Sequence, residues 1–209
     1  MYRLKLDAPV VSLDLVTAPA EEPMTTAEAK SHLRVDSSSE DALIDAYVAA
    51  ARSFYEEAIW RALITQTWAL RLEQWPWGDS ILLPRPPLQS VTSITYVDSD
   101  GDTNTMSSGD YTVYAQDPGR VWLGYSKSWP SATLRPGPAI TITFVAGYGD
   151  AEDVQEIDKQ AVRLILGHFY ENREEVVAIP GISLAQLPMA AQSIIRMRRS
   201  WVDASWKGR

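Results

Sequence analysis

The sequence contains few side chains that could perform chemistry. Its 209 residues include two histidines, His32 and His168, and no cysteine. Either histidine could act as a base or a metal ligand, but each lies in a predicted helix, where a structural histidine needs only one hydrogen bond. Without cysteine there can be neither a disulfide nor a thiolate metal site. We therefore predict that the protein is not an enzyme.

Two loops match known ligand-binding patterns only in part. Three aspartates alternate in residues 98–102, but a calcium loop requires glycine after the third acidic position, and Gly101 comes too early. The segment AGYGD, residues 146–150, places two glycines before a predicted helix but lacks the lysine and the spacing of a phosphate loop. We predict a solvated hairpin tip at the first loop, a strand-to-helix turn at the second, and no metal or cofactor.

The composition is typical of a folded protein without membrane segments. Apolar residues make up 45% of the chain and charged residues 22%, which argues against global disorder. No apolar run approaches the ~20 residues that span a bilayer, and the N-terminus lacks an apolar stretch of signal-peptide length. We expect no membrane partner and a reducing setting, either the cytosol or a particle assembled there.

Charge is distributed unevenly along the chain. The net charge is −8, but residues 176–209 carry +4 and the remainder carries −12. Such a basic tail could bind nucleic acid or an acidic protein, or it could be a helix end with solvated arginines. Trp201 and Trp206 flank it, and tryptophan and arginine are favoured as anchors at interfaces. We predict that residues 177–209 form a docking extension, with a terminal helix packed on its own domain as the alternative.

Two capping patterns predict helices near the N-terminus. Thr25 with Glu28, and Ser37 with Glu40, match the capping box, and they predict a short helix to about Val35 and a longer one after it. The apolar side chains of the longer helix share one wide face, whose neighbours could both lie within the fold or include another subunit. That face contains Leu43, Ile44, Tyr47, Val48, Ala51, Phe54, Tyr55, Ala58 and Ile59.

The hydrophobic period changes from Leu63 onward and becomes that of β-strands. Residues 64–73 alternate between apolar and polar positions, as in a half-buried strand. The Asp-Gly pair within residues 98–102 is typical of a tight hairpin. We predict an antiparallel meander of about six strands, near residues 64–73, 81–83, 91–97, 111–114, 121–123 and 139–146.

Helical period returns after Asp150, a candidate N-cap, and lasts to about Glu175. A shorter helix follows between residues 190 and 201. Residues 1–24 alternate weakly and contain three prolines, which is typical of an extended arm that adds a strand to another surface. We therefore predict an α+β fold. Its parts are an N-terminal arm (1–24), a helical core (25–61 and 150–176), an inserted antiparallel β region (62–149) and the C-terminal extension (177–209).

Five pieces of sequence, taken in order, resemble the head–tail connector (adaptor) family of long-tailed bacteriophages and related gene transfer particles. They are AEAKSHLRVDSSSEDALIDAYVAAAR, RALITQTWALRLEQWP, LPRPPLQSVTSITYVDSDG, ITFVAGYGD and GHFYENRE. Each piece is only a cap, a strand or a turn, but the ordered set covers about residues 20–176 and is specific. The first 20 residues and residues 177–209 match less distinctively.

The resemblance implies a non-enzymatic ring, typically a dodecamer, beneath the portal of a DNA-filled head. The helical core would form the ring, the inserted sheet would extend outward or toward the stopper and tail, and the C-terminal extension would bind the portal. DNA would pass through the channel without sequence-specific binding, and an acidic wall would repel its phosphates. We accordingly expect a virion component, assembled in the bacterial cytoplasm.

Two sets of candidate interface residues accompany this resemblance. For portal binding we expect Ile194, Ile195, Arg196, Arg198, Arg199, Trp201, Trp206 and Arg209. For contacts between subunits we expect Tyr47, Arg52, Phe54, Tyr55, Glu171 and Arg173.

Two other functions remain as alternatives. Exposed tryptophans of the β region, such as Trp77 and Trp129, could make it a carbohydrate-binding module. The basic tail, through Arg196, Arg198 and Arg199, could bind nucleic acid, with an affinity that falls steeply as salt increases.

Overall fold

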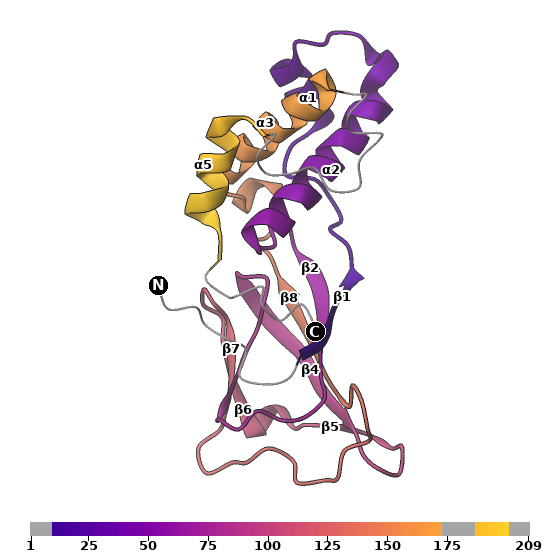
Figure 1. The fold of residues 1–209 in the computed structure, drawn as a ribbon, viewed down its shortest axis with the longest axis vertical. Coiled ribbons are helices and arrows are strands. Elements are labelled where there is room, and N and C mark those ends of the chain that lie inside the picture. The colour runs from indigo at the N-terminus through magenta and orange to yellow at the C-terminus, as the bar shows by residue number, and fades with distance from the viewer. Residues whose placement is uncertain (1–9, 173–186, 201–209) are drawn as a thin grey trace. The chain divides into compact units, whose positions relative to one another are not determined.

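The computed structural model describes residues 10–172 and 187–200. The chain forms two compact units, each built from separate stretches of sequence. The helical unit comprises residues 20–59 and 149–199, and the β unit comprises residues 60–148 together with the strand Val10–Thr17. Figure 1 shows the helices and strands of both units. The α+β fold predicted from the sequence is confirmed.

The helical unit begins with the predicted capping box. Thr25 Oγ1 accepts a hydrogen bond from the Glu28 amide at 3.2 Å, and Glu28 Oε2 accepts one from the Thr25 amide at 2.7 Å. These two bonds satisfy amides that the first turn of α1 would otherwise leave open. The helices of this unit are α1 (Thr26–Leu33), α2 (Asp41–Ile59), α3 (Glu156–Glu171) and α5 (Met189–Arg198). No helix among the described residues is long and apolar enough to cross a membrane.

The two longer helices start later than their capping residues predict. Ser37 caps a 3-10 turn, η1 (Ser38–Glu40), by accepting the Ser39 amide at 3.2 Å, and α2 follows that turn. Asp150 likewise precedes a 3-10 turn, η3 (Ala151–Asp153), so α3 does not start directly after Asp150 as predicted. Short polar side chains satisfy nearby amides within a single turn, and a 3-10 turn is a common lead into an α-helix.

Helices α2 and α3 form the core of the helical unit. The α2 side buries Ile44, Val48, Ala51, Tyr55 and Ile59, while the α3 side buries Ala161, Val162, Ile165, Leu166 and Phe169. Phe54 meets Phe169 edge to face, with ring centroids 6.1 Å apart. The rest of the wide apolar face of α2, namely Leu43, Tyr47, Phe54 and Ala58, stays partly exposed. The predicted face therefore divides into a buried half and an open half.

The β unit contains two antiparallel sheets. The five-stranded sheet has the order β1-β2-β8-β4-β5, and the three-stranded sheet has the order β3-β7-β6. A 3-10 turn, η2 (Ser108–Asp110), precedes β6. The strands are β1 (Val10–Thr17), β2 (Gln66–Leu72), β3 (Ser80–Leu82), β4 (Leu88–Val97), β5 (Thr103–Thr105), β6 (Tyr111–Tyr114), β7 (Arg120–Leu123) and β8 (Ile140–Ala146).

The predicted meander is wrong, because β8 lies between β2 and β4 rather than at an edge. Its register pairs Phe144 with Trp68 of β2 and with Val91 of β4. Alternate residues of β8, from Ile140 to Ala146, are fully buried. A strand of this kind gains most from the centre of a sheet, where both of its edges are hydrogen-bonded. The N-terminal arm adds the edge strand β1 to the subunit's own sheet.

Two tryptophans and one arginine of the β unit, Trp60, Trp68 and Arg85, form a cluster of aromatic and basic side chains. The Arg85 guanidinium lies 4.6 Å from the ring centroid of Trp60 and 5.0 Å from that of Trp68. Arg85 is buried, so its charge is stabilised by these rings in a setting with little water. Beside this cluster Gly147 has φ +124° and donates its amide to Pro87 at 2.9 Å. This is the strand-to-helix turn predicted for AGYGD.

Candidate docking surfaces

Helix α5 is held to the helical unit by a buried ion pair. Arg198 donates from Nε to Asp158 Oδ1 at 2.9 Å and from Nη2 to Oδ2 at 2.8 Å. The Tyr55 hydroxyl donates to Oδ1 at 2.7 Å. Asp158 has no exposed surface, and these bonds satisfy both of its oxygens, as a buried carboxylate requires. Because Ala191 and Ile195 are buried too, α5 belongs to the folded core of this unit.

The opposite side of α5 faces solvent. Met189 is 84% exposed and Met197 is 65% exposed, and Arg196 and Arg199 are exposed as well. Methionine is enriched at protein–protein interfaces, so two exposed methionines on one side of a helix make this side a candidate contact surface. Helix α5 contains no acidic residue, so this side is basic as well as apolar.

The predicted portal-binding residues thus separate into three groups. Arg196 and Arg199 are exposed and Ile194 is half-buried, so these three are placed where a partner can reach them. Ile195 is buried and Arg198 is engaged by Asp158, so both side chains serve the subunit's own core. Trp201, Trp206 and Arg209 lie outside the described residues.

The predicted subunit contacts separate in the same way. Tyr47 and Phe54 are half-buried and Glu171 is exposed, whereas Tyr55 is fully buried against Asp158. The sequence predicted Tyr55 at a contact between subunits because the helical period of the apolar residues shows the width of the stripe but does not show which half is buried within the subunit. Arg173 lies outside the described residues.

Arg52 has an internal role in the helical unit. It donates to both carboxylate oxygens of Glu22, at 2.7 and 3.1 Å, and to Glu56 at 2.7 Å. Burial lowers the pKa of Arg52, but the hydrogen bonds to Glu22 and the charge of Glu56 outweigh it, so the pKa is raised. The guanidinium therefore ties the segment before α1 to the side of α2.

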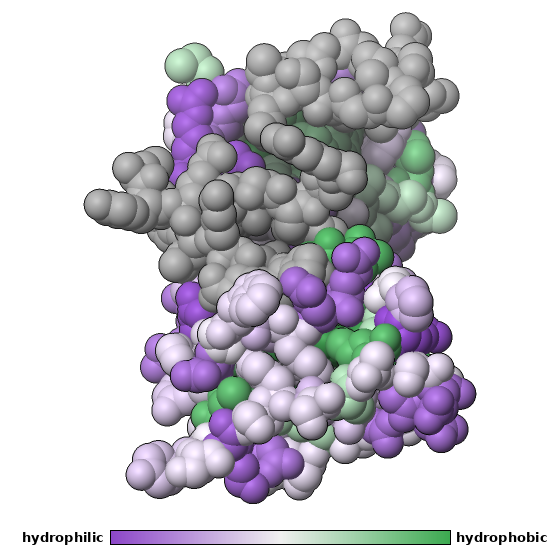
Figure 2. Space-filling view, turned by 60° about the horizontal axis from the view of Figure 1, so that its bottom comes forward, coloured by the Kyte–Doolittle hydropathy of each residue, from purple (hydrophilic) through white to green (hydrophobic). Residues whose placement is uncertain are grey.

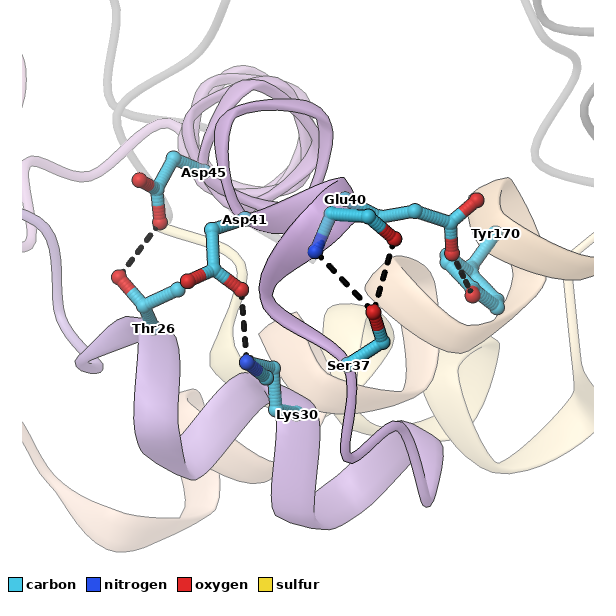
Figure 3. Close-up of polar contacts among 8 residues, drawn as sticks. Thr26, Lys30, Ser37, Glu40, Asp41, Asp45 and Tyr170 are labelled. Atoms are coloured by element: carbon cyan, nitrogen blue, oxygen red, sulfur yellow. Dashed lines mark hydrogen bonds and ion pairs between the residues drawn. The ribbon is translucent and has the colours of Figure 1, made fainter.

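Further polar contacts fix α1 and α3 to the start of α2, as Figure 3 shows. They are Thr26 Oγ1 to Asp45 Oδ1 and Lys30 Nζ to Asp41 Oδ1, each at 2.7 Å, and the Tyr170 hydroxyl to Glu40 Oε2 at 2.6 Å. Each joins residues far apart in sequence, so together they set the spacing of three helices. Sequence periodicity carries no signal for such pairs, because the partners belong to different elements.

The β unit presents exposed aromatic side chains at its loops. Trp77 is 95% exposed and Tyr125 is 99% exposed, while Trp122 and Tyr114 on the three-stranded sheet are about half exposed. Trp129, in contrast, stacks on Trp75 with ring centroids 5.1 Å apart and donates Nε1 to the Gly78 carbonyl at 2.8 Å. In Figure 2, small hydrophobic patches on this unit lie among pale and hydrophilic residues. The sequence did not indicate Tyr125, because a single tyrosine in a turn has no periodic context.

Two of the features considered for chemistry, the Asp98 loop and His168, have polar partners within the fold. Asp98 Oδ1 accepts the amides of Asp100 and Asp102 at 3.1 and 3.0 Å, which closes the predicted β4–β5 hairpin tip. Burial raises the pKa of Asp98, but the hydrogen bonds from the Asp102 amide and the Asn104 side chain outweigh it and lower the pKa. His168 Nδ1 lies 3.1 Å from the Asn172 side-chain nitrogen. Among the described residues, no group of acidic or histidine side chains is placed to hold a metal ion.

Comparison with known proteins assigns the chain to a family. The family model for head completion proteins matches residues 22–200. The chain belongs to the head completion protein family. No curated protein sequence matches it. The predicted role as a head–tail connector of phage-like particles is thereby confirmed, and neither alternative, the carbohydrate-binding module or the nucleic-acid-binding protein, is supported.

Solved structures of gene transfer agent particles contain similar chains. A chain in the virion of a native particle is 27% identical, with a TM-score of 0.73 over 91% of this chain and 96% of that chain. A chain in the neck of a native particle, determined with C12 symmetry, is 26% identical with a TM-score of 0.72 over the same shares. A chain in the neck of an empty particle, determined with C6 symmetry, gives the same identity and TM-score.

Proposed function

We propose that this head completion protein assembles into a non-enzymatic ring in the neck of a phage-like particle, between the portal and the stopper, and that DNA passes through the ring. The observation that carries the proposal is the similarity, over nearly the whole of both chains, to chains in necks with twelvefold and sixfold symmetry. A dodecamer is the ring that fits both symmetries.

The negative charge of the helical unit supports the proposal that DNA passes through the ring without being bound. The helical unit carries a net charge of −8 and the β unit a net charge of −2, so most of the negative charge resides in the helical unit. Three basic residues of α1, α2 and α3 are also paired with acids, as Lys30–Asp41, Arg52–Glu56 and Arg163–Glu156. A channel wall supplied by this unit would repel phosphates and give no salt-dependent DNA affinity.

The C-terminal residues are proposed to bind the portal. Helix α5 ends at Arg198, the residue anchored on Asp158, so the chain enters residues 199–209 from a fixed point. That segment contains Trp201, Trp206, Lys207 and Arg209, a combination of aromatic and basic residues favoured at interface anchors. The exposed Trp77 and Tyr125 of the β unit are proposed to contact the stopper.

Truncation after Ser200 tests portal binding. Because Ala191 and Ile195 of α5 are buried, removal of α5 itself would damage the fold, whereas removal of residues 201–209 spares every described helix. We expect a folded, monodisperse protein and an accumulation of heads without tails. The matched control replaces Lys207 and Arg209 with alanine, which separates the charge from the tryptophans. Tailed particles at the normal yield from the truncated chain would contradict portal binding by this segment.

A further inference from the structure

A closed ring requires two different surfaces on every subunit, because each copy contacts its two neighbours through opposite sides of a head-to-tail interface. The two surfaces must be complementary in shape and in charge. The helical unit contains one such pair of surfaces, on α5 and on α2.

The first surface is the exposed side of α5, which we call the methionine–arginine face. Its residues follow each other at intervals of three and four, so they share one side of the helix. The Arg198–Asp158 pair and the burial of Ile195 hold the helix in place, which keeps this face preorganised. The face consists of Met189, Ser193, Arg196 and Met197, with Arg199 at its end.

The second surface is the exposed side of α2, which we call the alanine face. It consists of Ala42, Ala46, Ala50 and Ser53, all exposed and again spaced by three and four. Two exposed acidic residues adjoin it, Asp45 at its side, where Oδ1 also accepts the Thr26 hydroxyl, and Glu57 at its C-terminal end. Small side chains on one side of a helix let another helix approach closely. In Figure 1, α5 and most of α2 lie on opposite sides of α3.

We propose that the methionine–arginine face of one copy packs on the alanine face of the next copy around the ring. Met189 and Met197 would pack over the small side chains, since methionine adapts to irregular surfaces. Arg196 and Arg199 would meet Asp45 and Glu57, a pairing of opposite charges that sets register and orientation. The proposal rests on the ring described above, and it reassigns Arg196 from portal binding to the contact between subunits.

A second copy fits the methionine–arginine face better than a separate acidic protein does. The apolar and basic surface of α5 has its counterpart, small and acidic, on another helix of the same unit. Repetition of that one contact joins each copy to the next, and it needs no further component.

Cysteine cross-linking tests this contact directly, because the natural chain contains no cysteine. Met197→Cys and Ala46→Cys are introduced together into the full chain, and assembled particles are oxidised and separated on a non-reducing gel. We expect a ladder of covalent multimers extending to the closed ring. Each single variant should give no ladder beyond a dimer. The matched control, Met197→Cys with Ala27→Cys on the exposed side of α1, should give none either.

The result separates this proposal from the ring itself. Particles that carry tails but give no ladder with the α5–α2 pair would overturn the contact while leaving the connector function intact. Absence of any ring by electron microscopy of the necks would instead overturn the ring on which the proposal rests.

Charge reversal provides a second, independent test that does not need oxidation. Arg196→Glu with Arg199→Glu should lower the yield of tailed particles at least about tenfold, as for an interface charge pair. Asp45→Lys with Glu57→Lys should lower it similarly, and the four changes together should restore most of the yield. Circular dichroism of each purified variant shows whether the subunit is folded. Folded variants without such restoration would contradict the pairing of these two faces.

Discussion

The helical unit and the β unit differ in net charge, in the contacts that hold them together and in the side chains that they expose. The helical unit has an excess of negative charge, ties its helices together with ion pairs and polar contacts between distant residues, and keeps half of an apolar stripe open. The β unit carries a net charge of only −2, has an apolar core formed by residues of both sheets, and exposes single aromatic side chains at loops. We infer that contacts between copies reside in the first unit and the contact with the stopper in the second. The predictions below test that division, beginning with the largest effect.

Replacement of Asp158 should destabilise the helical unit more than any other change discussed here. Asp158→Ala leaves the guanidinium of Arg198 and the hydroxyl of Tyr55 without their buried acceptor, at a cost of about 3–5 kcal/mol. Urea unfolding followed by circular dichroism measures this loss. Asp36→Ala, an exposed acid of the same unit, is the control and should cost less than about 0.5 kcal/mol.

The ion pair between Arg198 and Asp158 can also be replaced by apolar side chains instead of being broken. Asp158→Leu combined with Arg198→Met should recover most of the free energy of unfolding, since matched apolar groups often equal a buried ion pair. A double variant no more stable than Asp158→Ala would show that α5 is held by something other than this pair.

Gly147→Ala should destabilise the β unit by about 2–4 kcal/mol. Its positive φ disfavours any side chain, and a Cβ at this position would also overlap the carbonyl group of Ile64. Gly101→Ala is the matched control in the β4–β5 hairpin, because φ is positive there too but the surrounding space is open. It should cost only about 1–2 kcal/mol, the strain of the backbone alone. Equal losses at the two sites, measured by denaturant unfolding, would rule out the steric explanation.

The capping box of α1 should make part of the stability depend on pH. Hydrogen bonds from the Thr25 amide and hydroxyl lower the pKa of Glu28 in the folded state. The stabilisation is therefore present above the ordinary glutamate pKa and is lost as the pH falls through the lowered one. Glu28→Gln should flatten the stability profile below about pH 4.5, and Thr25→Ala should cost about 1 kcal/mol at pH 7. Denaturant midpoints between pH 3 and 7 provide the measurement; an unchanged profile in Glu28→Gln would contradict the linkage.

The exposed aromatic residues of the β unit should have the smallest effect on stability. Trp77→Ala and Tyr125→Ala remove side chains that are almost wholly exposed, so the free energy of unfolding should change by less than about 0.5 kcal/mol. If these residues contact the stopper, the same variants should lower the yield of tailed particles. Trp75→Ala, which removes the stacking partner of Trp129, is the contrasting control and should lower stability. Normal particle yield from the double variant would place the stopper contact elsewhere.

Local features were predictable from the sequence, and pairings between distant segments were not. The Thr25–Glu28 capping box and the Asp98 hairpin tip involve residues within four positions of each other, so their geometry follows from local chemistry. The position of β8 depends on competition among strands for the centre of the sheet, which no single strand reveals. Arg198 was expected to face a partner because nothing in the pattern of α5 points to an acid forty residues earlier.

The register of β2 against β8 has a mechanical consequence. Apart from β1, the chain enters the β unit just before β2 and leaves it just after β8, and Gln66 at the start of β2 pairs with Ala146 at the end of β8. Tension applied to the β unit would therefore pull on two adjacent strands at once, in the same direction along their length, so the hydrogen-bond ladders that join this pair to β1 and β4 would resist in shear. The two attachment points also lie as close together as paired strands allow. The β unit can thus be exchanged or enlarged during evolution while the helices that receive its two ends keep their spacing.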